Sequence, residues 1–395
     1  MTEKRVDSSE EAVGGYNRRS VFKTIGTGML LAKMGVVSGG KDTVEIPIEK
    51  RGDEVTRWKS VPEAWWHFEK KAQRVSERIS SSQSNNQFVT GVSIGTEERT
   101  IANRKVSNVI VYADKPDLDK LDLPGEIDGV RIKKERTPSI NNYRKGLRGN
   151  LLDAVGTSLD DHWGDCHNDC YDKIAGGALM ENGGGARFTA ATRVRHNGND
   201  RLLTCGHPFW NPDDCNPETY GQTVYHCRNQ LNAGDISKLN RSADYALIKP
   251  TSGMDVSGYR EHVHWTDVST IQVSGHATKE SLHEIKSQDE TVWKYGATTC
   301  NRDGLIKGYT ENAPWDDCVE DGIFVRSTNY AEDGDSGGPI YRTWKDAEGC
   351  EWATMISHVK GSPESKSDLW STAAYRVAQD NIEFGASWSS CGSTQ

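Results

Sequence analysis

The sequence predicts a mainly β protein in which a small α+β domain precedes a larger all-β domain. Beyond about residue 174, short β-branched and aromatic runs alternate with clusters of Gly, Asn and Asp, a pattern typical of the many short strands of a barrel or sandwich. Before that point, one segment with helical spacing of apolar residues is followed by three β-branched runs. The 395 residues leave room for both domains and a targeting segment.

Composition excludes some partners. The chain has 57 acidic and 48 basic residues and a net charge of -9, so it has no broad basic surface for a phosphate backbone, and we expect no nucleic-acid partner. All nine cysteines lie from Cys166 onward, which suggests an exported domain with disulfide bonds. Because nine is odd, at least one thiol stays free, pairs between chains or binds something else. Nothing in the sequence predicts an oligomeric state.

The N-terminal segment has the features of a targeting signal. Arg18 and Arg19 lie in NRRSVFK, and a small, apolar, glycine-rich stretch interrupted by Lys33 follows to residue 40. This stretch is too short and too interrupted to span a bilayer. It resembles a twin-arginine export signal, so we expect residues 1–40 to be removed and the mature protein to be secreted, extracellular and free of the membrane. The alternative is an ordinary helix start, because no clean A-x-A cleavage site follows.

Residues 55–140 form the predicted α+β domain, after a charged linker at about residues 40–55. Residues 62–79 predict an amphipathic helix, and PDLDKLDLP at residues 116–124 predicts a short helix or turn. The predicted strands are VTGVSIG, VSNVIVYAD and GVRIKKE at residues 89–95, 106–114 and 129–135. We interpret this domain as a structural or folding module without chemistry of its own.

The all-β domain is predicted for residues 174–391, after a connector at residues 141–173. Its strand-like segments are GARFTAATRV, RLLTCG, DYALIK, GIFVRS, GGPIYRTW and WATMISHV. Residues 372–384 (TAAYRVAQDNIEF) are compatible with a closing helix.

Two histidines and two cysteines lie close together in the connector, in DHWGDCHNDC at residues 161–170. Their spacing is not that of a standard zinc finger. We interpret the segment as a disulfide or a simple connector, with a metal site as the alternative that chelator-sensitive stability would favour. We expect no cofactor and no metal.

The strongest local motif is GDSGGP at residues 334–339, between two strand-like segments. Its glycines let another backbone approach Ser336 closely. A serine hydroxyl needs a base and a group that orients the base. His207, in LTCGHP after an apolar strand, can supply the base. Asp244, which leads the apolar DYALI, can orient the imidazole and stabilise its charged form.

The order His, Asp, Ser and these three motifs together resemble the chymotrypsin-like serine peptidase family, especially its streptogrisin branch. IAGG at residues 174–177 and KYGATTCNRDGLIKG at residues 294–308 extend the resemblance over about residues 174–391. It implies a double β-barrel with the active site between the barrels and a catalytic triad of His207, Asp244 and Ser336. The N–H groups of Gly334 and Ser336 would form the oxyanion hole.

By the same resemblance, the chain is a serine endopeptidase that hydrolyses protein or peptide substrates through an acyl-enzyme. The N-terminal domain would be a zymogen propeptide with processing near Ile174. The alternative is a catalytically inactive peptide-binding protein on the same fold.

The resemblance also suggests substrate-binding residues. The base of the primary specificity pocket would be Tyr330, six residues before the nucleophile; no acid stands there, so a preference for Arg or Lys is disfavoured, although Glu332 is near. Ser357 matches the strand that pairs with the substrate backbone, and its hydroxyl is a candidate to support Asp244. His358 is a candidate to contact a polar or acidic substrate side chain.

One departure from the family concerns cysteine. The family commonly has a cysteine just after the catalytic histidine, whereas Pro208 follows His207 here and Cys205 precedes it. We expect Cys205 to bond Cys215 or Cys227. The other possible pairs are Cys300 with Cys318 and Cys350 with Cys391.

Overall fold

The computed structural model describes residues 42–83, 86–138, 140–141, 174, 176–210, 223–226, 231–251, 262–265, 270–312, 324–363 and 368–385. The expected export signal, nearly all of the connector and residues 161–170 within it lie outside this set. Among the described residues, no helix has the length and apolarity needed to cross a membrane.

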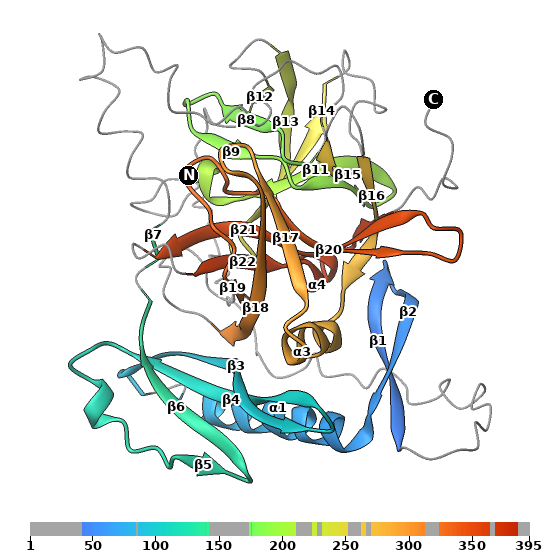
Figure 1. Cartoon of the computed structure of the whole chain (residues 1–395). Coiled ribbons are helices and arrows are strands. Elements are labelled where there is room, and N and C mark those ends of the chain that lie inside the picture. Colours follow the sequence, from blue (N-terminus) through green and yellow to red (C-terminus); the bar gives the residue numbers. More distant parts are fainter. Residues whose placement is uncertain are drawn as a thin grey trace, which may run out of the picture. The chain divides into compact units, whose positions relative to one another are not determined.

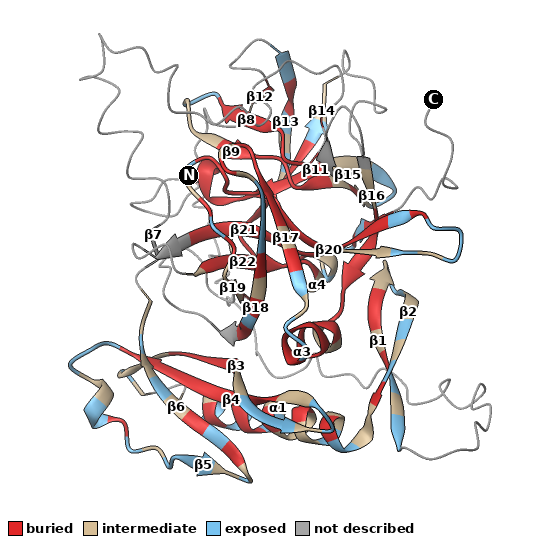
Figure 2. Cartoon of the chain, viewed as in Figure 1, coloured by how far each residue is buried: buried red, intermediate tan, exposed pale blue. Residues whose placement is uncertain are grey.

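The N-terminal α+β part contains the predicted helix and the three predicted strands. Helix α1 (Glu63–Gln83) packs on strands β3 (Val89–Ile101) and β4 (Arg104–Ala113). Strand β6 (Val130–Arg136) runs parallel to β4 beyond it. Further along the chain are the 3-10 helix η1 (Leu118–Lys120) and the short strands β5 (Glu126–Ile127) and β7 (Ile140–Asn141). The apolar face of α1 and the strands enclose a small core of their own (Figure 2).

The expected charged linker at residues 40–55 is wrong. Strands β1 (Thr43–Arg51) and β2 (Glu54–Pro62) form an antiparallel hairpin there. Val44, Ile46 and Ile48 stand at every second position and pack in a cluster with Trp65 of α1. This period of two is a strand signal that the charged residues around it obscured.

The first sheet of the all-β part is an eight-stranded half-barrel. Its strands follow the order β23-β10-β11-β14-β13-β12-β8-β9. Their bounds are β8 (Leu179–Asn182), β9 (Arg187–Thr189), β10 (Thr192–His196), β11 (Asn199–Cys205), β12 (Thr223–His226), β13 (Leu231–Asn240), β14 (Tyr245–Pro250) and β23 (Ile382–Phe384).

The second barrel is closed. The ring runs β17-β18-β19-β22-β21-β20 and returns to β17, every neighbouring pair being hydrogen-bonded. The bounds are β17 (Thr291–Gly296), β18 (Cys300–Asn312), β19 (Phe324–Ser327), β20 (Pro339–Lys345), β21 (Glu351–Pro363) and β22 (Leu369–Ala373). The predicted fold class, a mainly β chymotrypsin-like double barrel with a small N-terminal α+β part, is confirmed (Figure 1).

One apolar core joins the two barrels. Leu203 of β11 and Leu247 of β14 belong to the same buried cluster as Tyr341 of β20 and Met355 of β21. Each of these side chains is at most 1% exposed. The barrels are therefore fixed against each other by a continuous hydrophobic contact.

Strands from the N-terminal part extend the sheet of the closed barrel. Strand β16 (Thr270–Ala277) pairs with β15 (His262–Trp265), β1 and β21. At a second point, β3 pairs with β18. The N-terminal part is thus hydrogen-bonded to the barrel through main-chain groups at two separate strands.

Two helices were not foreseen correctly. Helix α3 (Lys279–Ser287), capped by the Thr278 hydroxyl, has no counterpart among the predicted elements. The expected closing helix at residues 372–384 is reduced to α4 (Ala374–Ala378), followed by a turn and strand β23. Asn381 in this turn has a φ of 59°, a left-handed conformation that ends the helix.

A buried polar cluster joins α1 to α3. The Glu69 carboxylate accepts the N–H of Ser107 at 2.8 Å and faces Lys286 Nζ at 3.3 Å and the His283 ring. The Tyr309 hydroxyl lies 2.7 Å from His283 Nε2 on the other side of the ring. Burial opposes the charge of Glu69, but Lys286 and then His283 outweigh it and lower the Glu69 pKa to about 2. Glu69 is therefore ionised in the folded protein.

Candidate active site

His207 and Asp244 meet at the ends of two paired strands. His207 starts a 3-10 turn, η3 (His207–Phe209), just after β11, and Asp244 immediately precedes β14. Because Cys205 pairs with Tyr245 in the antiparallel sheet, the two loops lie side by side. Asp244 has a φ of 43°, reached through a turn closed by its N–H to the Arg241 oxygen. Aspartate tolerates this left-handed conformation better than most residues.

The Asp244 carboxylate is fully buried and makes several contacts. Oδ1 accepts the N–H groups of Gly206 at 3.1 Å and His207 at 2.8 Å. Oδ2 lies 3.0 Å from His207 Nδ1 and 3.5 Å from Lys360 Nζ. Burial alone would raise the Asp244 pKa, but the positive charges of Lys360 and then His207 hold it well below its usual range. Asp244 is thus an ionised acceptor aimed at the imidazole.

This contact fixes the imidazole of His207. With Nδ1–H donated to Asp244, Nε2 is left to exchange a proton on the other side of the ring. Burial lowers the pKa of His207, but Cys205 and Asp244 outweigh it and raise the pKa to about 10. The neutral form needed for a general base therefore predominates only in alkaline solution.

Ser336 comes from the turn between β19 and β20, in the closed barrel. The Ser336 oxygen accepts the N–H of Thr189 at 2.7 Å, and the Thr204 hydroxyl donates to the Thr189 oxygen at 2.8 Å. Gly337, at φ 89°, leaves no space for a side chain, because a Cβ would lie 2.2 Å from the Thr189 oxygen. The glycine lets this turn pack against β11, the strand that leads to His207.

The structure brings Ser336 to the same region as His207 without a direct bond between them. Ser336 Oγ donates to the Lys360 oxygen at 3.3 Å. Among the described residues, no hydrogen bond joins Ser336 Oγ to His207. Such bonds are often long in free enzymes and tighten when substrate binds.

Gly334 and Ser336, the two residues expected to form an oxyanion hole, lie in the turn that precedes β20. Gly334 has a φ of 95°, and its oxygen is held by the Thr189 hydroxyl at 2.6 Å. The N–H of the intervening Asp335 turns back to the Glu332 oxygen. Within the described part of the chain, the N–H groups of Gly334 and Ser336 donate to no protein acceptor. They are available to a developing negative charge.

Asp335 anchors this turn. Its carboxylate lies 2.6 Å from Lys294 Nζ and accepts the N–H groups of Thr298 and Thr299 at 2.9 and 3.1 Å. Asp335 and Lys294 are fully buried. Burial lowers the pKa of Lys294, and the charge of Asp335 works against that effect. The buried ion pair of Asp335 with Lys294 therefore holds the turn before Ser336 in place.

The three expected substrate-binding residues lie in different surroundings. Tyr330 is 38% exposed, and its hydroxyl donates to Glu332. The assignment of Ser357 as a support for Asp244 is wrong: its hydroxyl bonds that of Ser371 at 2.7 Å, and Lys360 contacts the carboxylate.

His358, the candidate to contact a substrate side chain, makes another contact in this structure. It is 1% exposed, and its Nε2 bonds the Asp244 oxygen at 2.9 Å. Burial lowers the pKa of His358, so it acts as a neutral donor. It fixes the backbone behind Asp244.

The predicted disulfide of Cys205 is wrong as well. Cys205, two residues before His207 in the chain, is fully buried and carries a free thiol. Cys215, Cys227, Cys318 and Cys391 lie outside the described residues, so the other expected pairs stay predictions.

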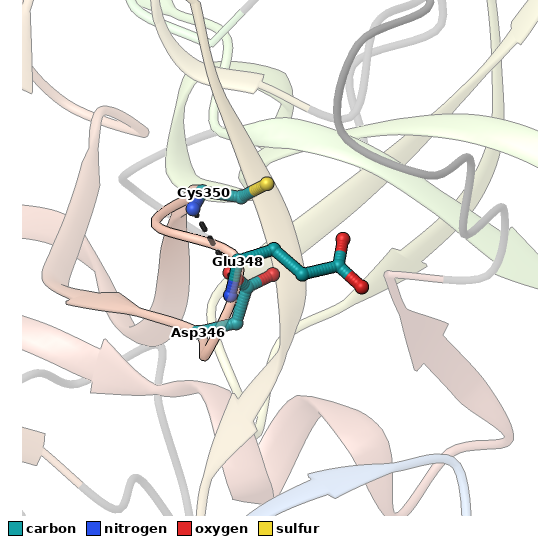
Figure 3. Close-up of side chains that lie close together, drawn as sticks. All are labelled: Asp346, Glu348 and Cys350. Carbon is teal, nitrogen blue, oxygen red and sulfur yellow. Dashed lines mark hydrogen bonds between the residues drawn. The ribbon is translucent and has the colours of Figure 1, made fainter.

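Two polar features elsewhere in the described residues lack the character of a catalytic site. Asp346, Glu348 and Cys350 lie together at the β20–β21 turn (Figure 3). Asp346 accepts the N–H groups of Glu348 and Cys350, both at 2.9 Å, and the Trp352 indole at 2.8 Å. Its carboxylate therefore caps the turn. A cavity of about 280 Å³ lies between the β1–β2 hairpin, α3 and α4, and none of the three triad candidates lines it.

No protein-family model matches the chain, and no curated protein matches it. Solved structures do. A glutamic acid specific serine protease is 18% identical, with a TM-score of 0.40, over 53% of this chain and 100% of its own. Cellulomonas bogoriensis chymotrypsin is 19% identical (TM-score 0.38, covering 54% and 98%), and Thermobifida fusca Protease A is 21% identical (0.37, 53% and 97%).

Proposed function

We propose that the chain is a serine endopeptidase with His207, Asp244 and Ser336 as its triad. The observation that carries the proposal is the buried His207–Asp244 pair, 3.0 Å apart, at the end of the barrel against which the Ser336 turn packs. A serine in a glycine-rich turn, an oriented histidine and two available N–H groups are the components that acyl transfer requires.

In the proposed reaction, Ser336 Oγ attacks the scissile carbonyl and His207 Nε2 accepts the hydroxyl proton. Asp244 stabilises the resulting imidazolium through Nδ1–H. The N–H groups of Gly334 and Ser336 bind the oxyanion of the tetrahedral intermediate. His207 then returns the proton to the leaving amine, and the reverse sequence with water frees the acyl group from Ser336.

The test is fluorophosphonate labelling of the wild-type protein beside Ser336→Ala, with the modified peptide identified by mass spectrometry. Labelling at Ser336 that disappears in the variant supports an assembled triad, because the reaction needs an activated serine. A folded protein that stays unlabelled between pH 7 and pH 10 would contradict the proposal. It would favour the alternative, a peptide-binding protein that has lost catalysis.

Export and processing belong to the same proposal. The twin-arginine motif supports secretion, and the main-chain pairing of the N-terminal part with the barrel suits a propeptide that is held against the barrel, with processing near Ile174. Ile174 is fully buried in an apolar cluster of the half-barrel. N-terminal sequencing of the secreted protein tests both steps, and an intact signal or an uncut chain in active material would count against them.

A further inference from the structure

Lys360 touches two components of the proposed site from one position on β21. Its main-chain oxygen lies 3.3 Å from Ser336 Oγ, and its ammonium lies 3.5 Å from Asp244 Oδ2. The side chain is fully buried. On a further side, the ammonium lies 4.9 Å from the centroid of the Phe324 ring, a favourable place for a cation.

The carboxylate oxygen that faces Lys360 also faces His207. Asp244 Oδ2 is 3.0 Å from Nδ1 of the imidazole and 3.5 Å from Lys360 Nζ. Two positive charges beside one carboxylate oppose each other, and in a buried site neither water nor salt screens them. A charged Lys360 therefore keeps Asp244 ionised and disfavours protonation of His207.

We propose that Lys360 is a positioning residue of the triad, which acts through Asp244 to favour the neutral form of His207. The inference rests on the proposed function. The ammonium offsets part of the negative charge that Asp244 presents to Nδ1, so that the imidazole accepts the Ser336 proton at a lower pH than it would beside an unpaired carboxylate.

Other titratable groups around His207 and Asp244 do not supply this effect. Cys205, at the end of β11, raises the pKa of His207. His358, on β21, bonds the Asp244 oxygen, and burial keeps it neutral by lowering its pKa. Among the described residues, Lys360 is the cation besides His207 that forms an ion pair with Asp244.

The direct test is the NMR titration of His207 in Ser336→Ala protein with and without Lys360→Met. Methionine keeps the length and apolar stem of the side chain and removes its charge. We expect the midpoint of His207 to rise by about 1 pH unit, the usual size of a neighbouring-charge effect. In the protein with Ser336 intact, fluorophosphonate labelling below the midpoint should slow about tenfold.

Two variants serve as controls. Lys360→Arg keeps the charge and should leave the midpoint close to that of Ser336→Ala alone. Lys345→Met removes the same charge from an exposed position on β20 and should move it little, because water and salt screen it. An unchanged midpoint in Lys360→Met, or an equal shift in Lys345→Met, would overturn the proposal.

The titration reports on Lys360 whether or not the chain is a peptidase, because it involves no turnover. A protein that never labels but shows the expected shift would sink the proposed function and leave this coupling standing. If Lys360→Met does not fold, the same coupling can be measured by NMR in protein that keeps Lys360 and carries 13C-labelled lysine. The Lys360 Cε signal, assigned by its loss in Lys360→Arg, should show an inflection at the midpoint of His207, and a flat signal refutes the coupling.

Discussion

The ammonium of Lys294 lies 2.6 Å from the carboxylate of Asp335, the residue directly before Ser336, and both side chains are fully buried. Removal of one partner leaves the other charge buried without its neighbour. We expect Lys294→Met to lower the free energy of unfolding by about 3–5 kcal/mol and to reduce labelling of Ser336 at saturating time. Urea unfolding followed by tryptophan fluorescence measures the first effect. Lys307→Met, an exposed change of the same charge on β18, should leave both unchanged; an equally stable Lys294→Met protein would contradict the anchoring role.

Asp244→Asn tests the orientation of His207. The amide cannot stabilise an imidazolium and favours the wrong tautomer, so kcat should fall roughly 10⁴-fold with little change in KM. Steady-state kinetics on a peptide substrate, with circular dichroism to verify folding, measures this. A loss of tenfold or less would show that Asp244 does not have the proposed role.

The raised His207 pKa predicts an alkaline enzyme. The base must be neutral, so kcat/KM should climb with a slope of one through pH 8–9 and level off near the pKa of about 10. The folded pKa lies above the ordinary value of 6.5, so the stabilisation from the His207–Asp244 pair is complete below about pH 6.5 and is lost as the pH rises to about 10. A pH–rate profile beside thermal melts checks both. A plateau already reached at pH 7 would be incompatible with this environment.

Acid should release the N-terminal part after processing. The Glu69 pKa is depressed from 4.5 to about 2, so its stabilisation, roughly 3 kcal/mol, is present above pH 4.5 and is lost as the pH falls toward 2. We expect the processed fragments to elute together from a sizing column at pH 7 and separately near pH 2–3. Glu69→Gln should separate at a higher pH than wild type. Elution that does not change with pH in either protein would exclude Glu69 as the link.

Cys205 should behave as a protected free thiol. It is fully buried, so iodoacetamide should leave it unmodified in the native protein and alkylate it in guanidinium without a reducing agent. Peptide mapping by mass spectrometry distinguishes the two states. Recovery of Cys205 in a disulfide-linked peptide would restore the pairing that we expected from the sequence.

The sequence located the three triad candidates because each lies in a short motif at a strand end. It could not locate their buried lysine partners. Lys294 and Lys360 stand in strands of the closed barrel, and a lysine is usually exposed to water, so only closure of the barrel buries them. The carboxylates that pair with them, Asp335 and Asp244, come from segments far away in the sequence.

The exchange of roles between Ser357 and Lys360 has a local cause. Strands β20 and β21 change register between Ile340 and Tyr341, and β21 changes register again with β22 between Val359 and Gly361. Each such bulge changes which side chains of a strand face the three triad candidates. A prediction that counts alternate residues along the sequence cannot include these changes of register. Hairpin β1–β2 was missed for a different reason, since its charged residues gave it the composition of a linker.

The pairing of β1 with β16 and of β3 with β18 has a consequence for the proposed processing of the chain. Loss of the N-terminal part would expose main-chain donors and acceptors at His276 and Ala277 and at Tyr309 to Asn312. Unpaired strand borders of this kind recruit strands from other molecules. If the N-terminal part is cut and released as proposed, we therefore expect it also to protect the barrel domain against aggregation. A concentrated solution of the processed protein should remain clear longer when the released fragment is present.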